Sequence, residues 1–415
     1  MIRYCSLDGC TPLKRCFLCT TSVLLSEINL SNNNPSHNVS LSEENANLPE
    51  NAPISPISSK LSACRTLENN PRNHNDSHIG RFYTLPSNLQ KQLFLTGGIT
   101  KTYADLSQTI RELVFMVRKP AIEVISYLET INLDSPAVRY VLHGEFGSGK
   151  SISLAHILHY GHSSGYILVH VPWIQYWLKF SKENSPSTFK AGRVDQPTEA
   201  TQWLQHFVAQ NGPLLTPLKT TKEYIWSKRE TTPTNSPLTA LIEHGLARPK
   251  FAADTVGAIC KELKIAAQTG DCKILVALDG VNAVFWPISR VFREDKSVVP
   301  PWDLTLVQAF MRFLKNDWNH GAVVTTVDAH ALPDTHRESH LPRYLIGNKG
   351  FDIMDPFLPI EVPLYSEKEF TSCLDYYIEK KWLQHPKAGT ELGRLELAQL
   401  TCRNPYTVMS VVASL

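Results

Sequence analysis

The sequence has no apolar run long enough to cross a membrane, and it has almost no net charge. Its longest apolar stretches, such as Ile274–Leu278, have the length of a strand rather than the roughly 18 residues of a spanning helix. The 41 basic and 39 acidic side chains leave a formal charge of +2, which argues against a small basic protein threaded through nucleic acid. Proline and glycine occur at ordinary levels, 27 and 20 of 415 residues, which excludes a collagen-like chain. These observations indicate a globular protein of one to three domains.

Aromatic side chains are absent from one long stretch near the N-terminus. Between Phe17 and Phe82 the sequence has no Phe, Tyr or Trp, and it is rich in Asn, Ser and Pro. A segment with so few large apolar groups cannot offset the entropy cost of ordering its backbone. We therefore predict a disordered linker over residues 26–79 and a folded region over residues 80–415.

Cysteine is neither abundant nor regularly spaced. The nine cysteines are an odd number, and five of them lie in the first 64 residues, a distribution that does not fit a disulfide scaffold. Cys16 and Cys19, with Cys5 and Cys10 nearby, have the spacing of half a zinc cluster, but a second pair in a folded context is missing. The favoured interpretation of this region is a cleaved leader.

Residues 1–25 are basic, as targeting segments are. Arg3, Lys14 and Arg15 are opposed only by Asp8, and an acid-poor start of this kind is typical of a mitochondrial presequence. A secretory signal is the alternative, because an apolar stretch follows the two basic residues and three N-x-[ST] sequons come after it. The intracellular chemistry of the next motif favours the mitochondrial presequence.

The most specific motif is a phosphate-binding loop. The pattern G-x-x-x-x-G-K-[ST] is matched in full by Gly144, Glu145, Phe146, Gly147, Ser148, Gly149, Lys150 and Ser151. The β-rich residues 137–143 precede the loop, and residues 152–160 follow it with the apolar spacing of a helix face. A loop between a strand and a helix directs backbone N–H groups at phosphate oxygens, and the helix N-terminus adds partial positive charge. We predict that these eight residues bind the phosphates of a nucleotide.

Two side chains of the loop and one acid elsewhere have expected roles. Lys150 would contact the β- and γ-phosphates, and the Ser151 hydroxyl would bind Mg²⁺. Asp279 follows an apolar run typical of a buried parallel strand, so its carboxylate should emerge at the same sheet edge and bind the metal through water. Many hydrolytic relatives place Glu directly after this Asp, whereas Gly280 stands here. No general base is visible, no residue is assigned as catalytic, and at most slow hydrolysis is expected.

Strands and helices alternate through the rest of the chain. Further strands are predicted at 166–171, 321–327 and 359–362, with helices between them, a pattern that indicates an α/β fold with a parallel sheet and flanking crossover helices. Thr325 or Thr326, at the end of its strand, is either a sensor of the γ-phosphate or an ordinary β-branched strand residue.

The same pattern divides the folded region into parts. Residues 80–135 are predicted as an N-terminal helical segment, residues 136–364 as the nucleotide-binding core, and residues 365–415 as a small C-terminal helical lid. Residues 178–233 have little strand signal and are predicted as an insertion of helices and loops, a common place for partner contacts. The basic residues around Arg118 are interpreted as a solvated helix face rather than as nucleotide ligands.

Beyond the loop, the chain resembles the death-associated protein 3 family of the mitochondrial small ribosomal subunit. The resemblance extends from about Gly80 to the C-terminus, and it rests on an ordered set of stretches at residues 80–84, 116–121, 144–151, 195–197, 226–230, 275–283, 293–297, 315–318, 355–357 and 382–385. It implies an AAA+-like P-loop fold, a mitochondrial location, and bound GTP or GDP with Mg²⁺ at the loop and Asp279. The family often has Thr where Ser151 stands, and either residue offers Mg²⁺ a hydroxyl.

The resemblance also implies a structural role in the head of the small ribosomal subunit, near its contacts with the large subunit. Partners would be small-subunit proteins, large-subunit proteins across the interface, and a limited area of rRNA, because a charge of +2 leaves few cations for phosphate contacts. No membrane partner is expected. The alternatives are an AAA+-type NTPase and a GTP-regulated adaptor in apoptosis outside the ribosome. The sequence motifs alone do not determine which nucleobase is bound, because an N-K-x-D guanine motif is missing.

Overall fold

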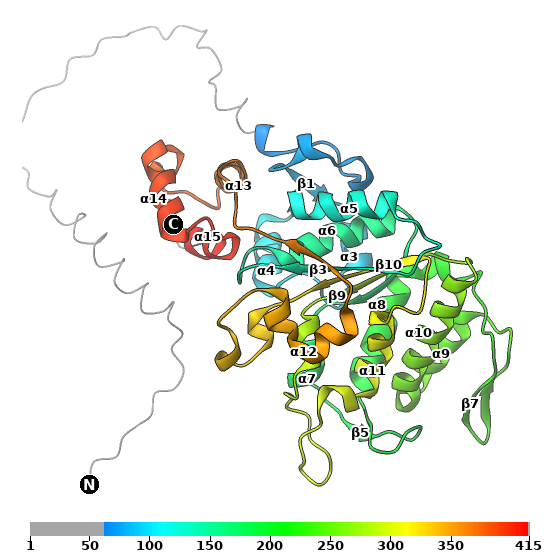
Figure 1. Ribbon diagram of the computed structural model, residues 1–415. Coiled ribbons are helices and arrows are strands. Elements are labelled where there is room, and N and C mark those ends of the chain that lie inside the picture. Colours follow the sequence, from blue (N-terminus) through cyan, green and yellow to red (C-terminus); the bar gives the residue numbers. More distant parts are fainter. Residues whose placement is uncertain (1–61, 414–415) are drawn as a thin grey trace, which may run out of the picture. The chain divides into compact units, whose positions relative to one another are not determined.

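The computed structural model describes residues 62–413 (Figure 1). The predicted leader and zinc half-cluster, and residues 26–61 of the predicted linker, lie outside the described residues. Within the described range, no helix is both long and apolar enough to cross a membrane.

The prediction of a disordered linker is wrong for residues 62–79. They form three short 3-10 helices, Ser62–Cys64, Pro71–Asn73 and Asp76–His78. Cys64, Pro71 and His74 of this segment are buried. Asparagine side chains at the starts of the second and third helices accept hydrogen bonds from backbone amides two residues on. Local caps and a few buried anchors therefore order a segment whose composition is that of a linker.

Among the described residues, five parallel strands form the central sheet (Figure 1). In spatial order they are β11 (Leu358–Glu361), β3 (Val138–His143), β10 (Gly321–Thr326), β9 (Ile274–Leu278) and β4 (Ile167–Val171). The middle strands are rich in Val, Ile and Leu and buried on both faces, as parallel strands covered by helices are. The predicted α/β class and all five predicted strand positions are confirmed.

Each face of the sheet carries a layer of helices. α5 (Lys119–Thr130) and α6 (Lys150–Ser163) pack on one face, and α8 (Pro197–Leu215), α10 (Ala252–Gln268) and α11 (Thr305–Met311) cover the other (Figure 1). Three further helices complete this core: α7 (Gln175–Lys179), α9 (Leu238–Ala247) and α12 (Pro342–Met354).

Alternate residues of each strand supply the two apolar cores. Val323 of β10 is buried in the core under α8, α10 and α11, whereas Ala322 and Val324 are buried in the core under α5 and α6. Successive side chains of a strand point to opposite faces of its sheet, which explains the division. Both faces are therefore covered mainly by apolar side chains.

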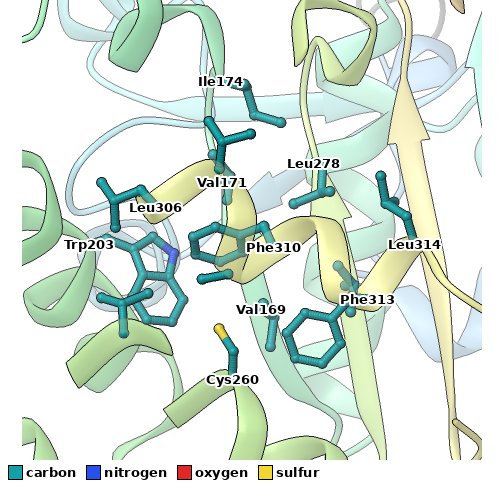
Figure 2. Close-up of a cluster of buried hydrophobic side chains, with 14 of the residues drawn as sticks. Val169, Val171, Ile174, Trp203, Cys260, Leu278, Leu306, Phe310, Phe313 and Leu314 are labelled. Carbon is teal, nitrogen blue, oxygen red and sulfur yellow. The ribbon is translucent and has the colours of Figure 1, made fainter. Parts of the chain in front are cut away.

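Figure 2 shows the larger core where α11 crosses the sheet. Phe310 of α11 meets the indole of Trp203 of α8 edge to face, with ring centroids 5.0 Å apart. Cys260 of α10 and Val169 of β4 close the space around the phenyl ring. These contacts pack α8 and α11 on one face of the sheet, beside β4.

The predicted N-terminal helical segment contains a strand pair that was not expected. β1 (Phe82–Leu85) and β2 (Leu113–Met116) pair antiparallel, with α3 (Ser87–Leu93) and α4 (Lys101–Ile110) between them. A four-residue apolar run such as β2 does not distinguish a strand from a buried helical turn. Its partner lies about thirty residues earlier in the chain, outside any local pattern.

Residues 178–233, predicted as an insertion of helices and loops, contain one long helix, α8, and two small strand pairs that were not expected. The pairs are β5 (Ser185–Pro186) with β6 (Val194–Asp195), and β7 (Tyr224–Ser227) with β8 (Glu230–Thr232). α8 packs on β4 and supplies Trp203 to the main core. α8 is therefore part of the sheet's helical layer, whereas the β5 and β7 strands lie on segments that extend from it (Figure 1).

The C-terminal lid is confirmed as three helices with a core of their own. They are α13 (Glu367–Glu379), α14 (Glu391–Thr401) and α15 (Pro405–Val412). Their apolar cluster includes Phe82 and Met116 of the β1–β2 pair. The lid therefore packs on the N-terminal strand pair, and both flank the open end of the sheet.

Two pairs of histidines are buried beside the sheet. His170 of β4 and His206 of α8 lie 2.9 Å apart between Nδ1 and Nε2, and His74 and His156 make the same contact at 2.9 Å. One ring of each pair must accept through an unprotonated nitrogen, so at least one ring of each pair is neutral. Burial lowers the pKa of each histidine, that of His206 to about 4.

We expect the free energy of unfolding to fall as the pH drops below about 6.5. Unfolded histidines take up protons near that pH, whereas the buried rings do so only at lower pH, so acid favours the unfolded chain. The loss should be roughly 1 kcal/mol per pH unit for each buried histidine, and it disappears above pH 6.5. Urea unfolding between about pH 8 and pH 5 measures it. His206→Gln should flatten the profile, and His385→Gln, at an exposed site, should not. A profile that is flat in the parent protein would contradict the expectation.

Candidate functional site

The phosphate-binding loop connects the end of β3 to the start of α6, as the sequence predicts. Gly144 and Gly147 adopt φ of +145° and +80°, where side chains other than glycine are strained. A Cβ at Gly144 would collide with the carbonyl oxygen of Val362, and one at Gly147 would lie 2.5 Å from Asn404 Oδ1. The backbone of the loop is therefore pressed between β11 and the lid, and only glycine fits there.

Lys150 is nearly buried, and its ammonium points back into the loop. Nζ donates to the carbonyls of Gly144 at 3.0 Å and Glu145 at 2.8 Å. It also pairs with Asp328 Oδ2 at 3.1 Å. The cation is therefore held over the concave side of the loop, where the phosphates of a nucleotide would lie.

Asp328 is a site residue that the sequence analysis missed. It stands just past the end of β10, and its other carboxylate oxygen accepts a hydrogen bond from the His330 amide at 2.7 Å. Burial raises the pKa of Asp328, but hydrogen bonds from His330 and the charge of Lys150 outweigh burial and hold the pKa below its usual range. An acid directly after an apolar strand is the same signal that identified Asp279.

Asp279 lies at the predicted position, at the end of β9. Its carboxylate accepts a hydrogen bond from the hydroxyl of Thr326. Burial raises the pKa of Asp279 to about 6, against the opposing effects of the Thr326 and Ser151 hydroxyls. The two residues predicted to bind the metal, Ser151 and Asp279, therefore lie near each other, and Asp279 is a carboxylate above about pH 6.

The two threonines of β10 have different surroundings. Thr326 donates to Asp279 and accepts from the Gly280 amide at 2.8 Å, so its hydroxyl orients the metal-side carboxylate. Thr325 donates to the Tyr140 carbonyl at 3.3 Å within the sheet. Of the two residues expected as phosphate sensors, Thr326 is the one adjacent to the site.

The donor set suits a phosphate chain with Mg²⁺. A hydroxyl and a carboxylate are the hard oxygen ligands that Mg²⁺ prefers when phosphates and water complete its shell. The Ser148 hydroxyl in the loop is fully buried and has no hydrogen-bond partner among the described residues. An unpaired buried hydroxyl beside a loop of backbone amides is a ready donor to a phosphate oxygen.

A cavity of about 330 Å³ opens from the loop. Lys150 and Ser151 form its charged end. Its other walls come from the strand pair and α4 on one side and from the lid on the other, and they are mostly aromatic or apolar: Phe82, Tyr103, Met116, Tyr365, Tyr377, Tyr406 and Met409. An apolar cavity beside a phosphate-binding loop has a suitable shape for the flat base of a nucleotide.

Arg118 joins the loop to the lid, and its interpretation as part of a solvated helix face is wrong. The guanidinium is buried and donates to the Ser148 carbonyl at 2.5 Å. It also donates to the Pro363 carbonyl at 2.8 Å and pairs with Glu369 of α13 at 3.0 Å. One side chain therefore fixes the loop, the end of β11 and the first lid helix together.

The last helix of the lid begins directly on the loop. Asn404 Nδ2 donates to the Phe146 carbonyl at 2.8 Å, and the Tyr406 amide donates to the Gly147 carbonyl at 3.1 Å. Two carbonyls of the loop thus receive hydrogen bonds from the lid. Neither contact has a local sequence signal.

Comparison with known proteins gives a consistent set of relatives. The family model described as "Mitochondrial ribosomal death-associated protein 3" matches residues 115–411, which include the loop, Asp279 and most of the lid. The protein named small ribosomal subunit protein mS29 of Bos taurus is 42% identical over 341 residues, covering 82% of this chain and 85% of that protein. The Mus musculus protein of the same name is 40% identical over 351 residues, covering 85% and 89%.

A solved structure also aligns with part of this chain. The ORC2 protein of Aeropyrum pernix, in ADPNP and ADP complexes, aligns over 71% of this chain and 66% of its own, with 14% identity and a TM-score of 0.26. The fold assignment therefore rests on the sheet order and the loop of this chain.

Proposed function

The chain belongs to the mitochondrial ribosomal death-associated protein 3 family, and from that premise we propose that it is a structural, guanine-nucleotide-binding component of the small subunit of the mitochondrial ribosome. Family membership also implies that the protein is mitochondrial. We propose a nucleotide because of the residues at the site, and we propose guanine as its base because of the family resemblance.

The proposal rests mainly on one observation: three parts of the chain meet at the phosphate-binding loop. The loop, the N-terminal strand pair and the lid all line the cavity beside Lys150. A bound nucleotide would contact all three and stabilise their arrangement, by about 2.7 kcal/mol when its concentration is a hundred times its Kd. Mg²⁺, bound by Ser151 and Asp279, would neutralise phosphate charge there.

The site is better suited to holding a nucleotide than to hydrolysing it. Hydrolytic relatives carry Glu after the metal-side Asp, but Gly280 here adopts φ of +73°. A Cβ at Gly280 would lie 2.7 Å from the Trp173 ring. The carboxylate of Asp328, which also lines the site, is held by Lys150 and His330. A general base is therefore excluded from the usual position by backbone and packing together.

Introducing the missing glutamate should not create an NTPase. We expect Gly280→Glu to release phosphate from GTP no faster than the parent protein and to lose stability by more than the roughly 1 kcal/mol of a strained backbone alone. Gly165→Glu is the matched control, because Gly165 has the same φ of +73° with open space around it. Phosphate release and urea unfolding measure the two effects. Rapid hydrolysis by Gly280→Glu would show that packing at Trp173 does not exclude the base.

The partners we propose follow from the family and from the low charge. Most contacts would be with small-subunit proteins of the head and, across the interface, with large-subunit proteins. Contact with rRNA would be limited to local basic patches, because a protein of charge +2 gains little from phosphate neutralisation.

Mass spectrometry of the nucleotide released from native mitochondrial ribosomes tests the proposal in one experiment. A stoichiometric guanine nucleotide associated with this chain is the expected result. Adenine nucleotide, or an empty site, would overturn the assignment. A monomeric chain with bound nucleotide would count against the alternative of a ring-forming AAA+-type NTPase. Recovery of nearly all the protein in small subunits would leave little room for an apoptosis adaptor outside the ribosome.

A further inference from the structure

The positive charge of the chain is concentrated around the β7–β8 hairpin. Between Lys219 and Phe251 the sequence has six basic and three acidic residues, a net charge of +3, whereas the whole chain has +2. The rest of the chain is therefore left with −1. The hairpin extends from the protein beside α9 (Figure 1), and no residue of this segment lines the cavity beside the phosphate-binding loop. The nucleotide site therefore does not account for its charge.

Two basic residues form the tip of the hairpin. Ser227 pairs with Glu230 across a two-residue loop that consists of Lys228 and Arg229. Hairpin loops of this length favour Asn and Gly, so turn geometry does not explain two adjacent cations. Both side chains are exposed, and the neighbouring carboxylate of Glu230 pairs with Arg248 instead. The tip therefore presents two positive charges to the solvent.

Three further cations gather at the base of the hairpin. Lys222 precedes β7, Lys261 lies on α10 and Arg312 directly follows α11, and all three side chains are exposed. The nearby Lys261 ammonium lowers the pKa of Lys222, and the Arg312 guanidinium adds to the effect. Like charges held close together repel, and a phosphate bound between them would replace repulsion by attraction.

The hairpin is fixed on the helices beneath it. The buried carboxylate of Glu262 on α10 accepts hydrogen bonds from the Thr221 amide at 2.8 Å and the Tyr224 hydroxyl at 2.5 Å. Trp226 stacks on His244 of α9 with ring centroids 4.8 Å apart. The cations are therefore carried on a preorganised support, which lowers the entropy cost of binding a partner.

The surface of the hairpin suits RNA better than a protein. Lysine is depleted at protein–protein interfaces, whereas Lys and Arg make most contacts to phosphates. Ile225, 72% exposed, is the one large apolar side chain exposed on the hairpin, which is too little for the apolar centre of a protein interface.

The aromatic residues of the hairpin are already occupied. Tyr224 and Trp226 are half-buried and stack on each other, with ring centroids 5.8 Å apart. Lys222 and His244 also pack on these rings. Their faces are therefore not open platforms for bases, and the contacts that remain are those of cations with the backbone.

We propose that the β7–β8 hairpin and the cations at its base bind the sugar–phosphate backbone of ribosomal RNA. This inference rests on the proposed place of the chain in the small subunit, and it identifies the basic patch through which the chain contacts rRNA. The contacts are to phosphates, so they depend strongly on salt and little on sequence.

RNA binding by the purified full-length chain tests the tip. The probe is a fluorescent single-stranded RNA of about 20 nucleotides, titrated by anisotropy at several salt concentrations. Lys228→Ser with Arg229→Ser should weaken binding about tenfold at about 100 mM salt. It should also lower the slope of log K against log salt by about 1.4, because each phosphate contact contributes about 0.7.

A charge-matched variant is the control. Lys91→Ser with Lys387→Ser removes two exposed cations elsewhere and should bind RNA as the parent protein does. Unchanged GDP affinity in both double variants shows that each is folded. Equal losses of RNA affinity in the two variants, or no loss in the tip variant, would overturn the proposal. Lys222→Gln with Lys261→Gln should also weaken RNA binding, and unchanged binding would remove the base of the hairpin from the site.

Two competitors test the class of partner. A second RNA of unrelated sequence should bind within about threefold of the first, because phosphate contacts carry no sequence information. A glutamate peptide with as many negative charges should bind more weakly, because its charges are less densely spaced than phosphates. Tighter binding of the peptide would overturn RNA as the partner and indicate an acidic protein segment.

A photo-crosslinking amino acid at position 229, in mitochondrial small subunits containing the full chain, tests the site in the ribosome. We expect crosslinks to rRNA above those of the same amino acid at position 91. Crosslinks to protein alone would overturn the hairpin's RNA contact while leaving the chain in the small subunit. Absence of the chain from small subunits would instead contradict the proposed function itself, so the two failures are distinguishable.

Discussion

Replacing Lys150 with Ala is expected to lower the affinity for GDP about a hundredfold or more. The ammonium lies within 3.1 Å of two loop carbonyls and Asp328, so it is already placed where it would meet the phosphates. Removing a pre-positioned charge-assisted contact to phosphate costs several times more than removing a surface cation. Titration with a fluorescent GDP analogue in the presence of Mg²⁺ measures the change. Lys261→Ala, an exposed lysine on α10, should bind as the parent protein does.

The same variant should enter mitochondrial small subunits poorly, because the stability that a bound nucleotide adds is lost. Lys150→Ala also leaves Asp328 without its cation, although the hydrogen bond from the His330 amide remains. The double variant Lys150→Ala with Asp328→Asn removes that leftover charge. Poor incorporation of both variants would support the role of the nucleotide, and normal incorporation of an empty protein would show that the nucleotide is dispensable.

The second large effect is expected at Arg118. Arg118→Ala should lower the free energy of unfolding by about 3–5 kcal/mol, because it leaves the buried carboxylate of Glu369 without its partner. Both side chains of this pair are only 6% exposed. The variant also removes the hydrogen bond to the Ser148 carbonyl, so nucleotide affinity should fall with stability. Urea unfolding with and without GDP measures both.

The ion pair of Arg394 with Asp375 is a suitable control for this prediction. Its guanidinium lies 2.6 Å from the carboxylate, but the two side chains are 25% and 22% exposed. Arg394→Ala should cost less than about 1 kcal/mol, as half-exposed pairs do. Equal losses for Arg118→Ala and Arg394→Ala would mean that burial at the lid does not set the strength of the contact.

Local patterns predicted the parts of the site that lie along one stretch of chain. The strand, loop and helix around Lys150 carry a spacing that follows directly from phosphate chemistry, and the apolar run before Asp279 identifies a strand whose end must reach the same edge. The parallel sheet and the lid followed from the alternation of strand and helix periods. The loop and the strand before Asp279 are each signalled within about ten residues, and the alternation repeats such local signals along the chain.

The missed features depend on residues that are distant in sequence. Arg118 looked like part of a solvated face because its partners, Ser148 and Glu369, are 30 and 251 residues away. Asn404 likewise reaches the loop across 258 residues. The ordered segment at 62–79 has the composition of a linker and owes its order to a few buried contacts, such as His74 with His156. Composition and periodicity carry no information about such pairings.

The position of the lid has a consequence for how the protein matures. Residues that line the cavity beside the loop extend from Phe82 to Met409, and the Phe146 and Gly147 carbonyls accept hydrogen bonds from Asn404 and Tyr406. A chain that is still being synthesised or imported lacks these contacts until nearly all of it has emerged. If the chain binds a nucleotide as proposed, capture is therefore expected late in folding, after the last helix has formed.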